Sequence, residues 1–317
     1  EARRRAEQEA AISEAVVQFL NDDLFAGSVE GDGLPGEITV SELFERARTR
    51  VEDRFARQPL VEAAIRQALA TSLHTLGQYG AAFQESERAF NLRTEALGPD
   101  AEATLESMSL HAWLGRYHWD AARCTAVAEE TVRRATTSLG RDHPITISAM
   151  SRLAWIHYSN RVPHEEIQPL IIETVELARR QPEADPQTFI RSLHLHGRVV
   201  RTADREDRFR EALDFAQETL GPDHPWSINA LGVLAGYLHD AEHNLEEART
   251  LAATALQKHI RLFGDAHPNS IVHRKNLKLI CWRLKRWDEG LFHELRHFQL
   301  GGREAPSLEH FRHSLSR

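Results

Sequence analysis

The chain has 317 residues, of which 41% are hydrophobic and 27% charged, a balance typical of a folded protein. Its net charge of −8 argues against a general nucleic-acid binder, which needs a basic face to neutralise phosphates. Two cysteines, Cys124 and Cys281, cannot form a disulfide framework, and no run approaches the roughly 18 apolar residues of a membrane span.

The N-terminal residues predict a helical extension over residues 1–57. Residues 1–25 carry an apolar face of one helix, made of Ile12, Val16, Phe19, Leu20 and Leu24. Residues 27–37 are rich in glycine, which indicates a loop. Thr39 and Glu42 then form a capping box that opens a helix through Phe55. Because the first residue is Glu1 and not Met, we expect a longer protein to precede it.

A glycine-containing break recurs at a fixed period through the rest of the chain. Gly98 and Gly140 lie 42 residues apart, and Gly221 and Gly264 lie 43 apart. The 81 residues between Gly140 and Gly221 span two periods, and the segment 182–186 is the break between them, without its glycine. Such a period is typical of a helical solenoid. At each break the glycine ends one helix, the aspartate can cap the next, and the proline fits its first turn.

A second, weaker break falls in the middle of each period, as at Leu76-Gly77-Gln78-Tyr79 and Leu114-Gly115-Arg116-Tyr117. Each period therefore holds two antiparallel helices. Apolar residues recur three and four apart almost everywhere, and strand signals are nearly absent. We predict an all-α fold with a solenoid over residues 58–300. We expect residues 301–317 to form a tail, in which Ser307 to Arg317 cover the last apolar face.

These motifs resemble tetratricopeptide repeats. The Leu-Gly-x-Tyr turn, the small residues Ala82 and Ala89, and the Leu97-Gly98-Pro99-Asp100 break carry the resemblance. The Gly-x-Asp-His-Pro turn and the long period are similar to repeats of the kinesin-light-chain type. The resemblance covers roughly residues 58 to 298 and about six repeats. It implies a right-handed α-solenoid whose first helices line a concave groove that binds a protein or peptide.

In the kinesin-light-chain type, an asparagine eight residues after the proline often faces this groove. Only Asn276 matches that residue; the same slot elsewhere holds Gln67, Leu110, Arg152, His194 and Val233. Polar side chains in the slot could donate to a peptide backbone or carboxylate. Arg191 and His273 lie three residues earlier and should share the face. The candidate binding residues are therefore Gln67, Arg152, Arg191, His194, His273 and Asn276. The alternative is that they are ordinary solvated residues.

The N-terminal segment carries a second resemblance, through residues 17–24, 39–43 and 54–63. It is similar to the segment that joins a transmembrane helix to repeats in bacterial membrane-anchored serine/threonine kinases and winged-helix regulators. This implies a membrane link upstream of residue 1 and repeats on the periplasmic side of the inner membrane. The alternative is a cytosolic scaffold without a membrane link, and homodimer formation is left open.

One catalytic motif is present, His293-Glu294-Leu295-Arg296-His297, which matches the HExxH pattern of zinc hydrolases. Glu304, Glu309 and His310 would be its possible third ligands. However, Gly290 and His297 also occupy the two small-residue slots of the last repeat, and no strand-rich lobe exists to hold a substrate. We therefore favour a non-catalytic fragment.

The other reactive residue types have structural interpretations. His143, His224 and His267 belong to the breaks, and the pairs His194/His196 and His239/His243 are expected to be solvated or to cap helices. We expect buried, unreactive cysteines and tryptophans packed between repeats. No cofactor is expected, because Gly31-Asp32-Gly33 lacks the lysine and the strand of a phosphate loop.

Overall fold

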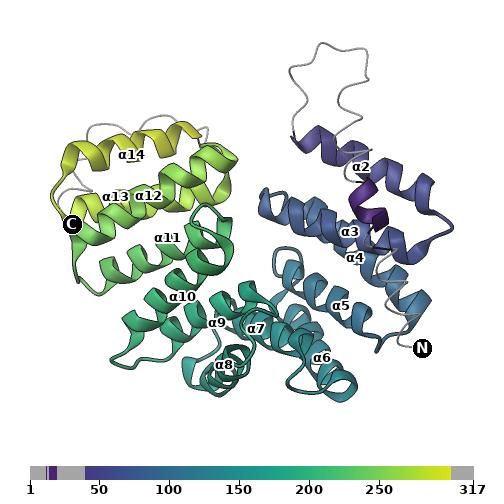
Figure 1. The fold of residues 1–317 in the computed structure, drawn as a ribbon. Helices are drawn as coiled ribbons and strands as arrows, with labels where there is room; N and C mark the ends of the chain where they lie inside the picture. Colours follow the sequence, from purple (N-terminus) through teal and green to yellow (C-terminus); the bar gives the residue numbers. More distant parts are fainter. Residues whose placement is uncertain (1–11, 13, 20–39, 301–317) are drawn as a thin grey trace, which may run out of the picture. The chain divides into compact units, whose positions relative to one another are not determined.

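A computed structural model describes residues 12, 14–19 and 40–300, and in these residues every regular element is a helix. The all-α prediction is therefore confirmed. The helices are α2 (Val40–Phe55), α3 (Pro59–Thr75), α4 (Tyr79–Leu97), α5 (Glu102–Gly115), α6 (Ala121–Leu139), α7 (Pro144–Ser159), α8 (His164–Arg179), α9 (Pro186–Val199), α10 (Arg205–Leu220), α11 (Pro225–Asp240), α12 (Leu245–Phe263), α13 (Pro268–Arg283) and α14 (Trp287–Leu300) (Figure 1).

Part of the N-terminal prediction and all of the tail lie outside the described residues. Residues 14–19 are helical, as predicted, but the rest of the 1–25 helix except residue 12, the glycine-rich loop and Thr39 of the capping box are not described. The same holds for residues 301–317. Among the described residues, no helix combines the length and the apolar character needed to cross a bilayer.

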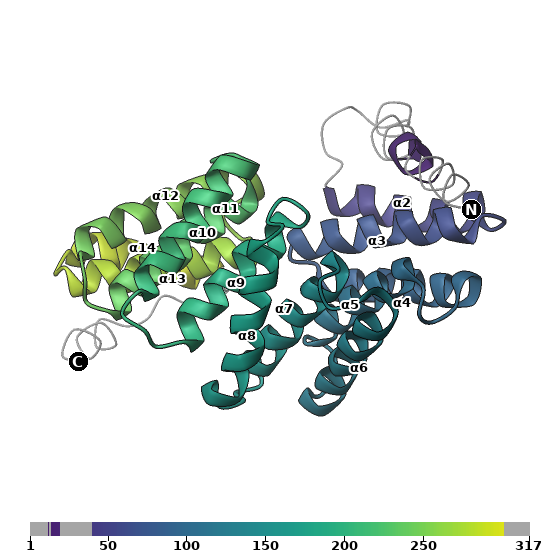
Figure 2. The same ribbon diagram turned by 60° about the horizontal axis from the view of Figure 1, so that its bottom comes forward.

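The chain divides into two compact units, residues 1–163 and 164–317. In unit 1, each of the helices α2 to α7 packs on the next, and α5 also packs on α7. In unit 2, α8 to α14 pack in the same sequential way, while α11 contacts both α9 and α13 (Figure 2). Contacts with the next and the next-but-one helix are those of stacked helix pairs. The predicted limits of the array at residues 58 and 300 stay a prediction.

The glycine of each break has the backbone conformation that the sequence predicted. Gly98, Gly140, Gly221 and Gly264 end α4, α6, α10 and α12 with φ of 87°, 94°, 91° and 84°. A side chain is disfavoured at positive φ, so glycine is the residue that ends the helix there at low cost.

The helix caps after these glycines differ from the prediction. His143, His224 and His267, and not the preceding aspartates, cap α7, α11 and α13. In each case Nδ1 accepts a hydrogen bond from the backbone N–H two residues later, at 3.3, 3.2 and 3.1 Å. An imidazole nitrogen can thus satisfy one of the free donors of a helix start. In the break between repeats that lacks glycine, aspartate is the cap: Asp185 accepts from Thr188 N at 2.9 Å.

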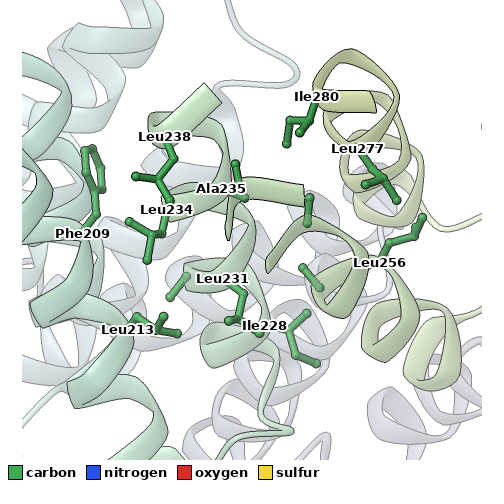
Figure 3. Packing of buried hydrophobic residues seen from close by; sticks show 14 of the residues in the cluster. Phe209, Leu213, Ile228, Leu231, Leu234, Ala235, Leu238, Leu256, Leu277 and Ile280 are labelled. Carbon is green, nitrogen blue, oxygen red and sulfur yellow. The ribbon is translucent and has the colours of Figure 1, made fainter. Parts of the chain in front are cut away.

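Each unit has its own apolar core. In unit 1, side chains of α2 to α5 enclose Phe19, Ile65 and Leu69. In unit 2, α10 to α13 contribute the cluster around Ile228, Leu234 and Ile280 (Figure 3). Cys124 and Cys281 are buried in separate units and unpaired. Burial, followed by the charge of Glu289, raises the pKa of Cys281 to about 12, so its reactive thiolate is disfavoured. This supports the predicted structural role of that thiol.

Candidate functional site

The first helices of consecutive repeats lie side by side within each unit, α5 with α7 and α9 with α11 and α13. Their faces are where the six candidate binding residues were placed. Gln67 and Arg152 belong to unit 1, and the other four belong to unit 2.

In unit 1, both candidates contribute to contacts between helices. The side-chain oxygen of Gln67 accepts hydrogen bonds from Arg93 Nη1 at 2.8 Å and Ser107 Oγ at 2.5 Å, which ties α3 to α4 and α5. Arg152 is half-buried on α7, and its Nη1 donates to Ser109 Oγ on α5 at 2.8 Å. A ligand that needs these groups would first have to break bonds that connect the helices.

Three of the four candidates in unit 2 are buried: Arg191, His194 and His273. Arg191 donates to Thr188 Oγ1 at 2.6 Å, and its guanidinium lies 5.8 Å from the Trp226 ring. Burial lowers the pKa of His194 to about 3, and the charge of Arg198 adds to the effect. The earlier interpretation of His194 as solvated or capping is therefore wrong. The other histidine of this sequence pair, His196, is half-buried, and burial lowers its pKa as well.

His273 owes its burial to a glycine in the preceding repeat. A Cβ built on Gly232 of α11 would lie 2.3 Å from Cε1 of the His273 ring, so only glycine leaves room for that ring. Burial, followed by the charge of His267, lowers the pKa of His273 to about 4. The imidazole is therefore neutral at pH 7 and belongs to the interior of unit 2.

Asn276 is the candidate that lies on an accessible surface. Val272 and Leu279, one turn before and after it on the same side of α13, are 53% and 36% exposed. On α11, Asn229, Val233 and Gly236 occupy the equivalent positions 43 residues earlier and are partly exposed. We call these six residues the α11–α13 face. The sequence analysis missed Val272 and Leu279, although their spacing around Asn276 was the available signal.

The α11–α13 face has the chemistry of a peptide-binding surface. The amide of Asn276 offers both donors and an acceptor, which suits a peptide backbone. Exposed valine and leucine beside it can bury apolar side chains of a partner, the main source of favourable free energy at interfaces. Together these groups can bind an extended or helical segment, and none of them is a nucleophile or a general base.

The zinc motif lies among cations. His293 Nδ1 is 3.3 Å from Arg274 Nη1, and the Glu294 carboxylate forms an ion pair with the Lys278 ammonium. A metal ion at His293 or Glu294 would therefore be repelled by the positive charge of Arg274 or Lys278. Among the described residues, no three histidine, cysteine, aspartate or glutamate side chains are placed to hold a metal. Glu304, Glu309 and His310 lie outside those residues.

A metal ion that binds only the native state raises the thermal midpoint of unfolding. Because the described residues offer no metal site, we expect equimolar Zn²⁺ to leave this midpoint unchanged within about 1 °C. Differential scanning fluorimetry with and without a chelator measures this. His297→Gln is the matched variant. A zinc-dependent rise in the wild type that His297→Gln removes would restore the hydrolase hypothesis.

The tryptophans and the histidine pair His239/His243 are the remaining predicted features. Five of the six tryptophans are half-buried, whereas Trp287 is 45% exposed at the start of α14. His239 and His243 lie near the surface, and their Nδ1 atoms are each 3.0 Å from a carboxylate oxygen, of Asp240 and Glu206 respectively. These two histidines are the solvated pair that the sequence suggested.

Comparison with known proteins finds a repeat family that matches parts of the chain. The tetratricopeptide repeat family model matches residues 63–100, 201–225 and 228–269. No curated protein matches the chain. A solved structure of BtubC (BKLC) from P. vanneervenii is 14% identical, covers 74% of this chain and 95% of its own, and gives a TM-score of 0.52. The solved structure of the kinesin light chain nearly identical TPR-like repeats of Podosopora anserina is 16% identical, covers 62% of this chain and 94% of its own, and gives a TM-score of 0.44. At these identities, the likeness to BtubC shows the fold alone.

Proposed function

We propose that this chain, which contains tetratricopeptide repeats, is a non-catalytic module that binds a protein or peptide partner through the α11–α13 face. Tetratricopeptide repeats generally mediate protein–protein interactions, and stacked first helices present an extended surface for them. The observation that carries the proposal is the exposure of Val272 and Leu279 on either side of Asn276.

The proposal predicts loss of binding when this face is charged. We expect peptides selected on the wild-type protein from a displayed library of random 12-residue peptides to bind Val272→Asp/Leu279→Asp at least about tenfold more weakly. The reason is that the carboxylates must be desolvated against the apolar side chains of the peptide. Asn276→Ala should weaken binding about fivefold, since a buried peptide group would lose its partner. Isothermal titration calorimetry with one selected peptide measures both.

A matched control is available on α12. Leu262 is 47% exposed in the same unit but outside the α11–α13 face, so Leu262→Asp adds the same kind of charge at another site. This variant should bind the selected peptide as the wild type does. Equal binding by the Val272→Asp/Leu279→Asp variant, or a loss shared with Leu262→Asp, would place the partner elsewhere.

The setting of the module is a further part of the proposal. We place it on the periplasmic side of a bacterial membrane-anchored signalling protein, where partner binding would act on the segment that leads to the membrane. The resemblance of residues 17–24, 39–43 and 54–63 to such linkers supports this, and the cytosolic scaffold is the alternative. Protease accessibility of the full-length protein in spheroplasts separates the two. Cleavage of the repeats only after lysis would favour the scaffold.

A further inference from the structure

Six glycines lie within the described helices, and four of them make room for a ring. A Cβ built on any of these four would lie within 3.0 Å of an aromatic or imidazole ring: Gly115 of Trp119, Gly197 of Phe209, Gly232 of His273 and Gly290 of Trp282. Gly80, in the first turn of α4, would meet His118 at an ordinary 3.9 Å. Glycine makes a helix less stable than alanine does, and at these four positions the packing of the ring offsets that loss.

Gly236 of α11 differs from the other five. None of the described residues has an atom within 4 Å of a Cβ built on it. Leu234, Ala235 and Leu238 beside it belong to the core (Figure 3), whereas Gly236 is partly exposed on the α11–α13 face. Alanine would fit at this position without a clash and would favour the helix. Packing within the described part of the chain therefore does not account for a glycine there.

The repeat register shows which kind of side chain fits on Gly236. Gly197 and Gly236 both lie eleven residues after the proline that opens their helix, and the ring of Phe209 packs on Gly197. Phe209 lies twelve residues before the glycine that ends α10. The same position before Gly264, which ends α12, is Ala252. The repeat of α11 therefore has the glycine but not the ring that packs on it in the preceding repeat.

The space over Gly236 has apolar neighbours on two sides. Val233 lies one turn earlier on α11 and is partly exposed. Leu279 has the position of Gly236 on α13, 43 residues later, and is 36% exposed. Because α11 and α13 lie side by side in the stack, Leu279 lies beside Gly236. A flat apolar ring suits a space bordered in this way.

We propose that Gly236 determines the specificity of the α11–α13 face by admitting an aromatic side chain of the partner between Val233 and Leu279. This inference rests on the proposed function, since it assigns a ligand side chain to the same face. The ring would lie against the backbone of α11, as Phe209 lies on Gly197, and would bury both apolar neighbours. The amide of Asn276, one turn before Leu279, can bind the backbone of the same segment.

A double-mutant cycle on the intact chain tests the proposal. The probe is a 12-residue peptide selected on the wild type from a displayed random library that loses binding to Val272→Asp/Leu279→Asp. We expect it to contain an aromatic residue whose replacement by alanine weakens binding at least about tenfold. Gly236→Leu fills the space and should weaken binding of the parent peptide about tenfold. In this variant the alanine peptide should bind as well as the parent, because both changes remove the same contact. Isothermal titration calorimetry measures all four affinities.

Thermal unfolding separates a role of Gly236 in binding from one in folding. Gly236→Ala should raise the thermal midpoint by about 2 °C, since alanine favours the helix and meets no atom of the described residues. The same variant should bind the peptide about threefold more weakly, because its methyl group occupies part of the space for the ring. Gly232→Ala, one turn earlier on α11, is the matched control. It should lower the midpoint by about 5 °C, because its Cβ would meet the His273 ring.

The possible failures are distinguishable. If Gly236→Leu binds the selected peptide as the wild type does, the role of Gly236 is refuted and the proposed function stands. A midpoint of Gly236→Ala as low as that of Gly232→Ala would also refute it, since the glycine would then serve the fold. If every selected peptide binds Val272→Asp/Leu279→Asp as tightly as the wild type, the proposed function and this inference are refuted together.

Discussion

Lowering the pH from 6.5 to 5 is expected to destabilise unit 2 by several kcal/mol, because three buried histidines must stay neutral for it to remain folded. Burial lowers the pKa of His194 and His259 to about 3 and that of His273 to about 4. An unfolded chain binds protons at these residues near pH 6.5. Between about pH 4 and 6.5, the unfolded state therefore holds more protons, and stability falls as the pH falls.

The size of the loss of stability follows from the number of histidines that titrate. Each histidine contributes a slope of about 1.4 kcal/mol per pH unit in that range, and the stabilisation is complete only above about pH 6.5. Among the described residues, no carboxylate offsets the cost at His259 or His273. His259 Nδ1 is paired with Ser270 Oγ at 2.9 Å, and its ring lies 4.8 Å from that of His267 and 5.3 Å from that of His273. Protonation would thus place positive charges side by side.

Urea unfolding at pH 7, 6, 5.5 and 5, followed by hydrogen exchange of α12 and α13, measures the slope. In His259→Gln/His273→Asn the slope should fall by about 2.8 kcal/mol per pH unit, since two titrating histidines are removed. His243→Gln is the control, because the His243 side chain is 66% exposed and hydrated in both states. Identical slopes in the wild type and the double variant would show that acid acts on other groups.

These histidines show how far the sequence specifies the structure. The glycine breaks could be predicted from the sequence because positive φ is a local requirement at Gly98 or Gly221 that depends on no distant residue. The helix pairs could be predicted for a similar reason, since the spacing of apolar residues and the first-turn proline are features of each helix by itself. The identity of the cap could not be predicted, because aspartate and histidine lie within two residues of each other in the break and both can accept a hydrogen bond.

The candidate site depended on contacts between repeats, which explains its partial prediction. His273 was placed on the binding face by its position after Pro268, yet it is buried because Gly232, 41 residues earlier, leaves space for its ring. Gln67 was predicted to be available to a ligand, but its side-chain oxygen accepts hydrogen bonds from Arg93 and Ser107. Asn276 could be placed from its own helix because Val272 and Leu279 flank it on one exposed side. A local pattern therefore gives the face of a helix, while burial depends on the neighbouring helix.

Replacing Arg66 by methionine is expected to destabilise unit 1 by about 3–5 kcal/mol, which is the usual cost of removing one partner from a buried ion pair. Arg66 is buried in α3, and its Nε donates to Glu62 Oε1 at 2.7 Å while Nη1 donates to Glu85 Oε2 at 2.8 Å. Burial favours the neutral form of Arg66, but its hydrogen bonds and the charges of both glutamates outweigh this and raise its pKa. Without the guanidinium, Glu62 and Glu85 would remain as buried carboxylates, with Arg48 as the other cation on Glu85 at 2.7 Å.

The network as a whole is expected to add little net stability, because desolvation of its charges offsets their attraction. The triple variant Arg66→Met/Glu62→Leu/Glu85→Met should therefore regain the wild-type free energy of unfolding or exceed it by about 1–4 kcal/mol. Arg48 would keep Glu45 and Gln84 as partners, both at 2.7 Å, so its charge would not be stranded. Urea unfolding of the three proteins at pH 7 decides the matter. A loss below 1 kcal/mol in Arg66→Met would mean that water reaches the glutamates, and a triple variant as unstable as the single one would mean that the ion pairs themselves hold α3 to α4.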